Sequence, residues 1–334
     1  MKKTIAIVAG GDSSEHDVSL RSAAGIASFL DQERYRAYII EIKGLSWEAL
    51  LPDGTRSTID RNDFSFAHGD ERIRPDFAYI TIHGTPGENG ILQGYLDLIQ
   101  LPYSTSDVLV EAMTFNKFTL NQYLKGFGVS VSESMVIRKG FEHLVTPQEV
   151  VSRIGLPCFV KPNAGGSSFG VTKVKVADEL PDAIARAMHE SDEVMVEAFM
   201  KGTEITCGCY KTSTKEVVLP ITEVVTQNEF FDYDAKYNGQ VSEITPARLN
   251  PDTAERVRLI TSHIYDILGC SGIVRIDYII THTDTPDGPH ERINMLEINT
   301  TPGMTATSFI PQQVKAAGLE MRDVLTDIIE DKMP

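Results

Sequence analysis

Segments with the pattern of strands alternate with segments of helical pattern in the first third of the chain, and this alternation limits the possible folds more than any other feature. A β-branched apolar run, TIAIVAG (4–10), precedes a glycine turn and the amphipathic segment VSLRSAAGIASFL (18–30). The runs YRAYIIEI (35–42) and DFAYITIHG (76–84) repeat the strand pattern, and ILQGYLDLIQL (91–101) repeats the helical one. Alternating strands and helices are typical of βαβ units, so we predict an α/β domain with a parallel sheet over residues 1–103.

The rest of the chain has the pattern of an α+β protein in two parts. Residues 104–199 combine helical segments with short strands around a glycine-rich loop. Residues 200–334 are rich in strands, include the long helical segment PDTAERVRLITSHIYDILG (251–269), and close with a helix expected from about Gln312. We therefore predict a chain in three parts, with boundaries at 1–103, 104–199 and 200–334.

The charge balance disfavours several classes of partner. The chain has 31 basic and 47 acidic side chains, which gives a formal net charge of −16. Such a charge repels nucleic acid and anionic membrane surfaces, whereas a few lysines in one cleft still permit a nucleotide. The apolar run at residues 4–10 is too short for a secretory signal, and no stretch approaches the ~18 apolar residues of a membrane span.

The four cysteines, Cys158, Cys207, Cys209 and Cys270, do not have the spacing of a zinc site. Cys207 and Cys209 occupy alternate positions of one strand-like segment and so share a face, where we expect buried thiols. Free thiols in a chain without a secretory signal favour a reducing compartment, and the predicted location is cytoplasmic.

The segment KPNAGGSSFGV (161–171) is close to the pattern of a phosphate-binding P-loop but differs from it after the second glycine. Gly165 and Gly170 have the P-loop spacing, yet Val171 stands where the motif requires Lys, and the segment that follows has the pattern of a strand where a P-loop opens a helix. A loop between two strands can still cover phosphates through its backbone N–H groups and the hydroxyls of Ser167 and Ser168, with Lys161 as a point charge. An ordinary hairpin loop is the alternative.

Two strand-like segments, VRIDY and MLEIN, carry polar side chains in an apolar setting. Alternation puts Arg275 and Asp277 on one face, and likewise Glu297 and Asn299. Two carboxylates and an amide are the hard oxygen ligands that suit Mg²⁺ bridging substrate phosphates. A buried structural ion pair of Arg275 with one of the acids is the alternative. If the acids bind metal, Arg275 is available to stabilise an oxyanion, and Gly303 offers an unobstructed backbone N–H.

Glycine-rich turns follow two of the N-terminal strands, in GGDSSEHDVSL (10–20) and HGTPGENG (83–90). Ligands of parallel sheets bind at this edge, so Glu15 could hold a substrate ammonium with His83 beside it. Helix capping is the commoner role of an acid such as Glu15 or Asp17.

A polar and aromatic segment, EFFDYDAKYNGQ (229–240), separates two strand-like segments and is typical of a lid. Lys236 and Tyr237 are the residues that we expect to face a ligand. The alternative is that the aromatic side chains only pack the loop against the protein.

Taken together and in this order, these segments resemble the D-alanine–D-alanine ligases of the ATP-grasp superfamily, from the first strand to the last helix. The segments that carry the resemblance are GGDSSEHDVSL, HGTPGENGILQG, KPNAGGSSFGV, VEAFMKGTE, YDAKY, RIDY and LEINTTPGMTATS. The resemblance implies an N-terminal α/β domain followed by a two-part ATP-grasp fold. It also implies the ATP-dependent joining of two D-alanines for peptidoglycan precursors. In that reaction ATP phosphorylates one D-alanine carboxylate, and the amine of the second D-alanine attacks the acyl phosphate.

The resemblance also implies how the nucleotide is bound. Two Mg²⁺ ions, or Mn²⁺ in their place, are expected on Asp277, Glu297 and Asn299. The residues expected to contact ATP are the phosphate ligands Lys117, Lys161 and Lys236, the flap residues Ser167 and Ser168, Glu197 at the adenine and Glu204 at the ribose.

On the amino-acid side, the resemblance implies that Glu15 binds the first ammonium and is linked through Ser167 to Tyr237. His83 is expected near the first substrate. The oxyanion is expected at Arg275 and the Gly303 amide, and the carboxylate of the second substrate at Ser308. A homodimer is the expectation for the family.

Three other functions compete with this one. Relatives that join D-alanine to D-lactate or D-serine share the ATP apparatus and differ mainly at the lid, where Lys236 and Tyr237 favour D-alanine. A nucleotide-binding protein without ligase activity is expected to lack a metal ligand or Arg275, and both are present. A dehydrogenase is disfavoured because the G-x-G-x-x-G pattern is missing after the first strand.

Overall fold

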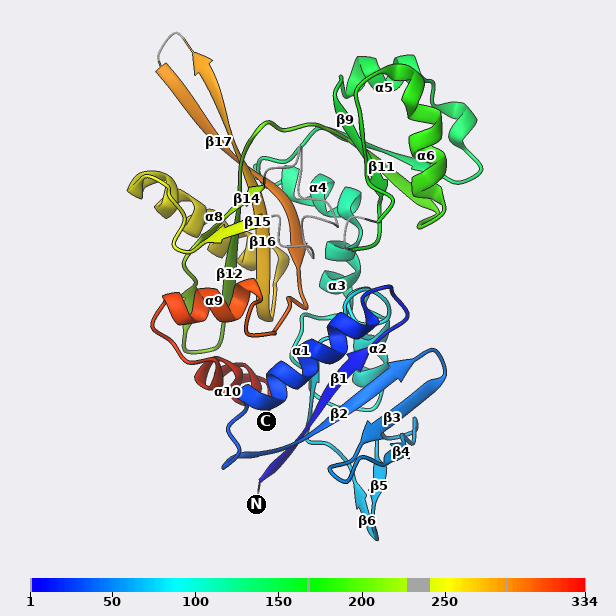
Figure 1. The fold of residues 1–334 in the computed structure, drawn as a ribbon, viewed down its shortest axis with the longest axis vertical. Helices are drawn as coiled ribbons and strands as arrows, with labels where there is room; N and C mark the ends of the chain where they lie inside the picture. Colours follow the sequence, from blue (N-terminus) through cyan, green and yellow to red (C-terminus); the bar gives the residue numbers. More distant parts are fainter. Residues whose placement is uncertain (1, 167–168, 227–240, 286–287, 334) are drawn as a thin grey trace.

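The computed structural model describes residues 2–166, 169–226, 241–285 and 288–333, and it contains three larger sheets (Figure 1). The first sheet has the order β4-β3-β2-β1-β7. Its strands are β1 (Lys3–Gly10), β2 (Tyr35–Lys43), β3 (Ser46–Leu50), β4 (Arg56–Thr58) and β7 (Phe77–Ile80). Strand β1 pairs in parallel with both β2 and β7, as predicted, but β3 and β4 extend the sheet in the antiparallel sense. The sheet is therefore mixed rather than wholly parallel.

Helices cover both faces of this sheet, and β1 is accordingly apolar and buried on both sides from Ile5 to Ala9. Ile5 and Ile7 face helix α1 (His16–Phe29), whereas Ala6 and Val8 share a core with Leu92 and Leu96 of helix α2 (Ile91–Leu98). The short hairpin of β5 (Phe66–His68) and β6 (Glu71–Ile73) lies beside the sheet.

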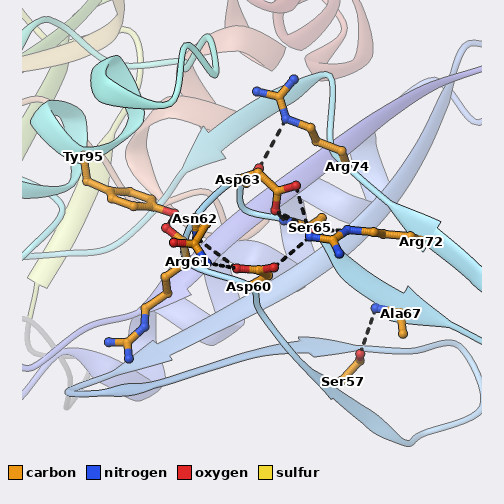
Figure 2. A network of polar contacts seen from close by, with 10 residues as sticks. All are labelled: Ser57, Asp60, Arg61, Asn62, Asp63, Ser65, Ala67, Arg72, Arg74 and Tyr95. Carbon is orange, nitrogen blue, oxygen red and sulfur yellow. Dashed lines mark hydrogen bonds and ion pairs between the residues drawn. The ribbon is translucent and has the colours of Figure 1, made fainter.

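A polar network fixes the turn that leads into β5 (Figure 2). Asp60 and Asp63 accept hydrogen bonds from backbone and side-chain donors two residues further along, and Arg72 donates to both carboxylates. Phe64, which is fully buried, takes a φ of 64° in the middle of this turn. A bulky residue in the left-handed region is strained, so the surrounding carboxylates and Arg72 hold it there.

The second sheet is antiparallel, with the order β10-β9-β11-β8. Helices α5 and α6 pack on one face through Val150, Leu180, Ala183 and Ala187. Helices α3 and α4 connect this sheet to the N-terminal one, and two 3₁₀ turns (Glu142–Leu144 and Ala177–Glu179) complete the segment. The bounds are α3 (Val108–Phe115), α4 (Lys117–Lys125), β8 (Ser134–Arg138), α5 (Pro147–Arg153), β9 (Cys158–Pro162), β10 (Thr172–Val174), α6 (Leu180–Met188) and β11 (Glu193–Ala198).

The third sheet has the order β15-β14-β12-β16-β17, with β13 paired to β12. Cys207 and Cys209 face helix α8 in a buried cluster, as predicted from their alternation, whereas Gly208 between them faces helix α9. All four cysteines are free thiols. The bounds are β12 (Gly202–Lys211), β13 (Glu216–Val218), β14 (Thr222–Thr226), β15 (Val241–Ile244), α8 (Pro251–Leu268), β16 (Gly272–Thr285), β17 (Gly288–Asn299), α9 (Phe309–Ala316) and α10 (Met321–Lys332).

The C-terminal segment forms two helices where a single one was expected from about Gln312. Helix α9 begins at Phe309 and ends at Ala316, and Gly318 beyond it has a φ of 71°, a conformation that favours glycine and commonly ends a helix. Helix α10 then returns to the N-terminal sheet and packs beside α1 (Figure 1). One core cluster therefore joins the two ends of the chain. The boundaries at 103 and 199 stay a prediction.

Across the described residues, no helix has both the length and the apolar character needed to cross a membrane.

Candidate active site

A cavity of about 360 Å³ gathers segments that are far apart in the sequence. The N-terminal domain contributes Glu15, His83 and Glu88, and the junction of α3 and α4 contributes Thr114, Phe115 and Lys117. The glycine loop contributes Gly165 and Gly166. Strands β15 to β17 and the segment after β17 complete the lining with Glu243, Arg275, Glu297, Asn299, Gly303 and Ser308. The cavity is thus lined by eight of the twelve predicted site residues that the structure describes.

The two predicted polar pairs lie side by side because β16 and β17 are neighbours in the sheet. Asp277 is opposite Glu297, and Arg275 is opposite Asn299. The Arg275 guanidinium donates two hydrogen bonds of 2.9 Å to the Asp277 carboxylate. Thr206 and Asn299 donate further hydrogen bonds to the same carboxylate at 2.5 and 3.3 Å. The structural ion pair and the oxygen cluster therefore coexist.

Arg275 carries a firm positive charge in this cavity. Burial alone lowers the pKa of its guanidinium, but the neighbouring Asp277 carboxylate overcomes that effect and leaves the pKa above its ordinary value. The guanidinium also lies 5.1 Å from the centroid of the Phe309 ring, a cation–π distance. These contacts fix a cation at the wall of the cavity.

The donor set at β16 and β17 fits a magnesium site that substrate oxygens complete. Asp277, Glu297 and Asn299 offer hard oxygen atoms within one patch of sheet. Within the ranges that the structure covers, no group of three or more His, Cys, Asp or Glu side chains could hold a metal ion by itself. Mg²⁺ at a phosphoryl-transfer site is commonly held by one or two carboxylates together with substrate phosphates, so two carboxylates and an amide suffice.

Lys117 connects the glycine loop to the carboxylates. Its Nζ donates to the Gly165 carbonyl at 2.6 Å and lies 3.9 Å from Glu297 Oε2. The position is set by Asn116, whose side chain caps helix α4 directly before Lys117. An ammonium between a glycine loop and a carboxylate suits an anionic ligand such as a phosphate.

Lys161 and Glu197 form a buried ion pair on the adjacent strands β9 and β11. Lys161 Nζ lies 2.5 Å from Glu197 Oε1, and both side chains are almost fully buried. Glu197 Oε2 has no hydrogen-bond partner among the described atoms, so a ligand donor could meet it. Glu204 is near the start of β12, and all three residues lie beyond the lining of the 360 Å³ cavity.

The glycine loop approaches the N-terminal sheet at Glu15. A Cβ atom added to Gly166 would lie 2.4 Å from Glu15 Oε2, so only glycine fits there without a shift. Glu15 immediately precedes helix α1 and makes no side-chain capping hydrogen bond to it. The capping alternative therefore does not describe Glu15.

His83 is buried next to Glu15 and Arg275. Burial lowers the pKa of the imidazole, Arg275 lowers it further, and Glu15 opposes both effects. The ring atom Nε2 has no hydrogen-bond partner within the described part of the chain. A neutral imidazole with an open nitrogen at the cavity wall can hydrogen-bond a substrate.

Gly303 and Ser308 lie together at the other end of the cavity. A Cβ atom on Gly303 would lie 2.8 Å from Ser308 Oγ, which shows how closely the backbone approaches this hydroxyl. Ser308 precedes helix α9, and its Oγ accepts a hydrogen bond from the Thr305 N–H at 3.1 Å.

The sequence interpretation missed Glu88 and Glu243, which both line the cavity. Glu88 accepts a hydrogen bond from the Gly84 N–H at 2.7 Å. Burial, with a contribution from the negative Glu15, raises the pKa of the Glu88 carboxyl to about 7. Glu88 falls inside the quoted segment HGTPGENG, so its place was visible from the sequence but its environment was not.

Four predicted site residues, Ser167, Ser168, Lys236 and Tyr237, lie outside the described residues. The predicted flap hydroxyls and the predicted lid contacts therefore stay predictions.

The order of the sheets along the chain defines the class of protein. An α/β sheet comes first, then an antiparallel sheet that holds the glycine loop, and then a sheet whose paired strands hold the carboxylates. This is the ATP-grasp arrangement that the sequence resemblance predicted, and the prediction of fold class is confirmed.

The chain belongs to the D-alanine–D-alanine ligase family. Residues 4–106 match the family described as D-ala D-ala ligase N-terminus, and residues 123–330 match D-ala D-ala ligase C-terminus. A D-alanine–D-alanine ligase of Phocaeicola vulgatus is 71% identical over 99% of this chain and 100% of its own length.

Solved structures with the same fold include two that bear on the substrates. The VanG D-Ala:D-Ser ligase of Enterococcus faecalis is 29% identical, with a TM-score of 0.84 and coverage of 99% of both chains. A D-alanine–D-alanine ligase of Bacillus anthracis in complex with ATP is 26% identical, with a TM-score of 0.73 and coverage of 99% of this chain and 96% of that one.

Proposed function

We propose that this protein uses ATP to join two D-alanines into D-alanyl-D-alanine, through an acyl phosphate, for peptidoglycan precursors. Membership of the family supports the reaction class. The observation that carries the proposal is the cavity in which Arg275, Glu297 and Asn299 meet Glu15 and His83. The cation of Arg275 and the oxygen ligands that phosphoryl transfer requires thus lie in the same cavity as Glu15 and His83, which can bind an amino acid.

The first half of the reaction needs a bound D-alanine whose carboxylate points toward ATP. Glu15 binds its ammonium, His83 lies beside it, and Ser167 and Tyr237 complete the link to the lid. The approach of Gly166 to Glu15 supports this, because it brings the phosphate-binding loop within contact of the ammonium site. The two reacting groups are thereby held together, which removes much of the entropic cost of the reaction.

Residues around the second and third sheets bind the nucleotide in this proposal. Glu197 Oε2, which lacks a partner among the described atoms, accepts a hydrogen bond from the adenine amino group. Glu204 holds the ribose. The residues that contact the phosphates are Lys117, Lys161, Lys236, Ser167 and Ser168.

Asp277, Glu297 and Asn299 hold two Mg²⁺ ions, or Mn²⁺ in their place. When bound, these ions neutralise the charge that moves with the γ-phosphoryl group. The chain orients its own ligands for this task, since Arg275 and Thr206 hold the plane of the Asp277 carboxylate.

In the second half of the reaction, the ammonium of the second D-alanine loses a proton, and the resulting amine bonds to the carboxyl carbon of the acyl phosphate. The bond from that carbon to the phosphate oxygen then breaks, and phosphate leaves with the protons that the nitrogen gives up. Ser308 binds the carboxylate of this second substrate. The negative oxygen that forms during attack is stabilised by Arg275 and by the Gly303 N–H. Gly303 and Ser308 lie close together, which supports the proposal that the oxyanion and the carboxylate of the second substrate are bound at the same end of the cavity.

The proposal extends to the whole protein. The chain divides at residues 103 and 199, acts in the cytoplasm and forms a homodimer. D-alanine and ATP are its ligands, and nucleic acid and membranes are not partners.

A D-alanine–D-serine ligase is the second candidate, because the VanG enzyme shares the fold over 99% of this chain. The two candidates differ only in the second substrate. Identification of the product therefore separates them.

The test is phosphate release from Mg-ATP with no amino acid, D-alanine, L-alanine, D-alanine plus D-serine, or D-alanine plus D-lactate, with the products identified by mass. We expect release that requires D-alanine and yields its dipeptide. If the protein binds the nucleotide but releases no phosphate under any of these conditions, it is a nucleotide-binding protein without ligase activity. A mixed D-alanyl-D-serine product formed in preference to the dipeptide would favour the second candidate.

A further inference from the structure

Glu243 is a carboxylate in the cavity that the proposed reaction does not use. It lies on β15 and lines the cavity together with Arg275, Thr307 and Ser308. The family resemblance assigns it no role. Its hydrogen bond to Gln312, on the helix that begins directly after Ser308, places it at the end of the cavity proposed for the second substrate.

Helix α9 holds the Glu243 side chain in place. Gln312 Nε2 donates to Glu243 Oε2 at 2.6 Å and also to the Thr307 carbonyl at 2.7 Å. Gln312 is a neutral donor, so it orients the carboxylate without cancelling its charge. The same helix begins directly after Ser308, and the two groups are thus positioned by one element.

Glu243 and Arg275 form a pair of opposite charges across this end of the cavity. They are close enough for their charges to interact, yet the Arg275 guanidinium makes its two-pronged hydrogen bonds to Asp277. A cavity end with a fixed cation, a fixed anion and the Ser308 hydroxyl complements a zwitterion. The carboxylate of an amino acid suits the Ser308 hydroxyl on the side of the positive Arg275, and its ammonium suits Glu243.

We propose that Glu243 binds the ammonium of the second amino acid and thereby selects an amino acid over a 2-hydroxy acid at that position. This inference rests on the proposed ligase function. D-lactate has the shape of D-alanine but carries a neutral hydroxyl where D-alanine carries the ammonium. It cannot form the charge-assisted hydrogen bond to the Glu243 carboxylate that an ammonium forms, so it binds less tightly. Selectivity of this kind acts through the charge of the substrate, whatever its size.

The experiment is a competition between second substrates, with products identified by mass. Wild type and Glu243→Gln are given Mg-ATP, D-alanine and an excess of D-lactate, and the ratio of dipeptide to depsipeptide is measured. Both products share the first D-alanine and ATP, so the ratio reports only the second position. Loss of one charge-assisted hydrogen bond predicts a ratio about tenfold to a hundredfold lower in Glu243→Gln.

A second competition, between D-alanine and D-serine, distinguishes charge from shape. Both amino acids carry an ammonium, so their product ratio is expected to change less than about twofold in the same variant. Ser242→Ala is the matched control, because neighbouring strand residues point to opposite faces of the sheet, and it is expected to keep both wild-type ratios.

The outcomes separate this inference from the proposed function. If wild type makes no dipeptide, the ligase function fails. If wild type makes the dipeptide and Glu243→Gln keeps the wild-type ratio of dipeptide to depsipeptide, the role of Glu243 is overturned and the ligase function stands. Should Glu243→Gln not fold, as judged by circular dichroism, Gln312→Leu serves in its place. It frees the carboxylate and is expected to lower the same ratio by a smaller factor, and an unchanged ratio overturns the inference.

Discussion

Glu88 is the residue whose ionisation the cavity perturbs most clearly. Burial raises the pKa of its carboxyl to about 7 from an ordinary value of 4.5. The folded state therefore binds a proton that the unfolded state has already lost between these two values. Stability falls as pH rises through that window, and the full penalty is present above about pH 7.

We predict that Glu88→Gln removes this pH dependence. The amide oxygen still accepts the Gly84 N–H but does not ionise. The free energy of unfolding of the variant should exceed that of wild type by up to about 3 kcal/mol above pH 7, and the difference should vanish near pH 4. Urea titrations between pH 4 and 8 measure it. A difference that is independent of pH would show that the carboxyl is not perturbed.

Glu297 allows a direct test of the oxygen cluster. It lines the cavity, faces Asp277 across the strand pair and lies 3.9 Å from Lys117. Glu297→Gln removes one negative charge and keeps the shape of the side chain. Substitution of a residue that only hydrogen-bonds a metal ligand lowers activity by up to roughly 100-fold, so loss of a ligand itself should lower turnover by more than that. Phosphate release is the measurement, with the exposed Glu255→Gln as control. Near-normal turnover in Glu297→Gln would show that Glu297 is no metal ligand.

The residues of the β16 and β17 pair could be predicted from the sequence because strand alternation decides which side chains share a face. Arg275, Asp277, Glu297 and Asn299 were identified in this way, and the structure brings them together. Glu243 could not be found by the same reasoning. Its role depends on a contact with Gln312, which lies 69 residues further along the chain on another element.

Helix α9 is the element that fixes this end of the cavity, and Gln313 joins it to the sheet. Its buried amide accepts a hydrogen bond from the Gly208 N–H and donates to the Thr206 carbonyl and the Thr222 hydroxyl, at 3.0 to 3.1 Å. Gly208 permits the approach, because a Cβ atom there would lie 2.8 Å from Gln313 Oε1.

Gln313→Met should destabilise the protein through this element. Methionine fills a similar volume but leaves buried polar groups unpaired, which predicts a loss of roughly 2–4 kcal/mol in the free energy of unfolding. Chemical denaturation compares it with Gln122→Met, an exposed glutamine on α4 that should change stability by less than about 0.5 kcal/mol. A loss below that of the control would mean that the three hydrogen bonds do not hold the helix.

Elements with a strong hydrophobic period were predicted well, and those set by a single turn residue were not. The long helix α8 and strand β1 agree with the predicted segments within a few residues. The break between α9 and α10 depends on the backbone conformation of Gly318. The spacing of apolar residues, from which helices are predicted, does not reveal this conformation. The antiparallel addition of β3 and β4 depends on a hairpin at Gly44, whose φ of 53° permits the tight turn.

At the scale of the whole molecule, the site depends on contacts that join the two ends of the chain. The Thr301 hydroxyl donates to the Ile82 carbonyl at 3.0 Å, and the Met304 N–H donates to the Ser22 hydroxyl at 3.3 Å. Helix α10 adds an apolar contact with α1. Such pairings between residues more than 200 positions apart leave no local pattern in the sequence. The sequence therefore indicates which residues belong to the site but not how far apart they lie in the fold.

A ligand that contacts both antiparallel sheets should stabilise the protein as a whole. In the proposed function, ATP meets Lys161 and Glu197 on the second sheet and Glu297 and Asn299 on the third. A ligand at about 100 times its dissociation constant adds about 2.7 kcal/mol to the stability of the folded state. At an unfolding entropy of about 2.1 cal/mol/K per residue, this corresponds for a chain of 334 residues to a rise in melting temperature of about 4 °C.

We predict this rise for wild type with Mg-ATP and a smaller one with ATP and EDTA, because phosphate binding then lacks the cation. Lys161→Met should lose most of the rise, whereas Lys139→Met, which removes an exposed lysine of an ion pair with Asp192, should keep it. Each variant is compared with itself, with and without ligand, since the loss of Lys161 also leaves Glu197 unpaired and lowers the melting temperature by itself. A full rise in Lys161→Met would mean that ATP binds without contact to the buried Lys161–Glu197 pair.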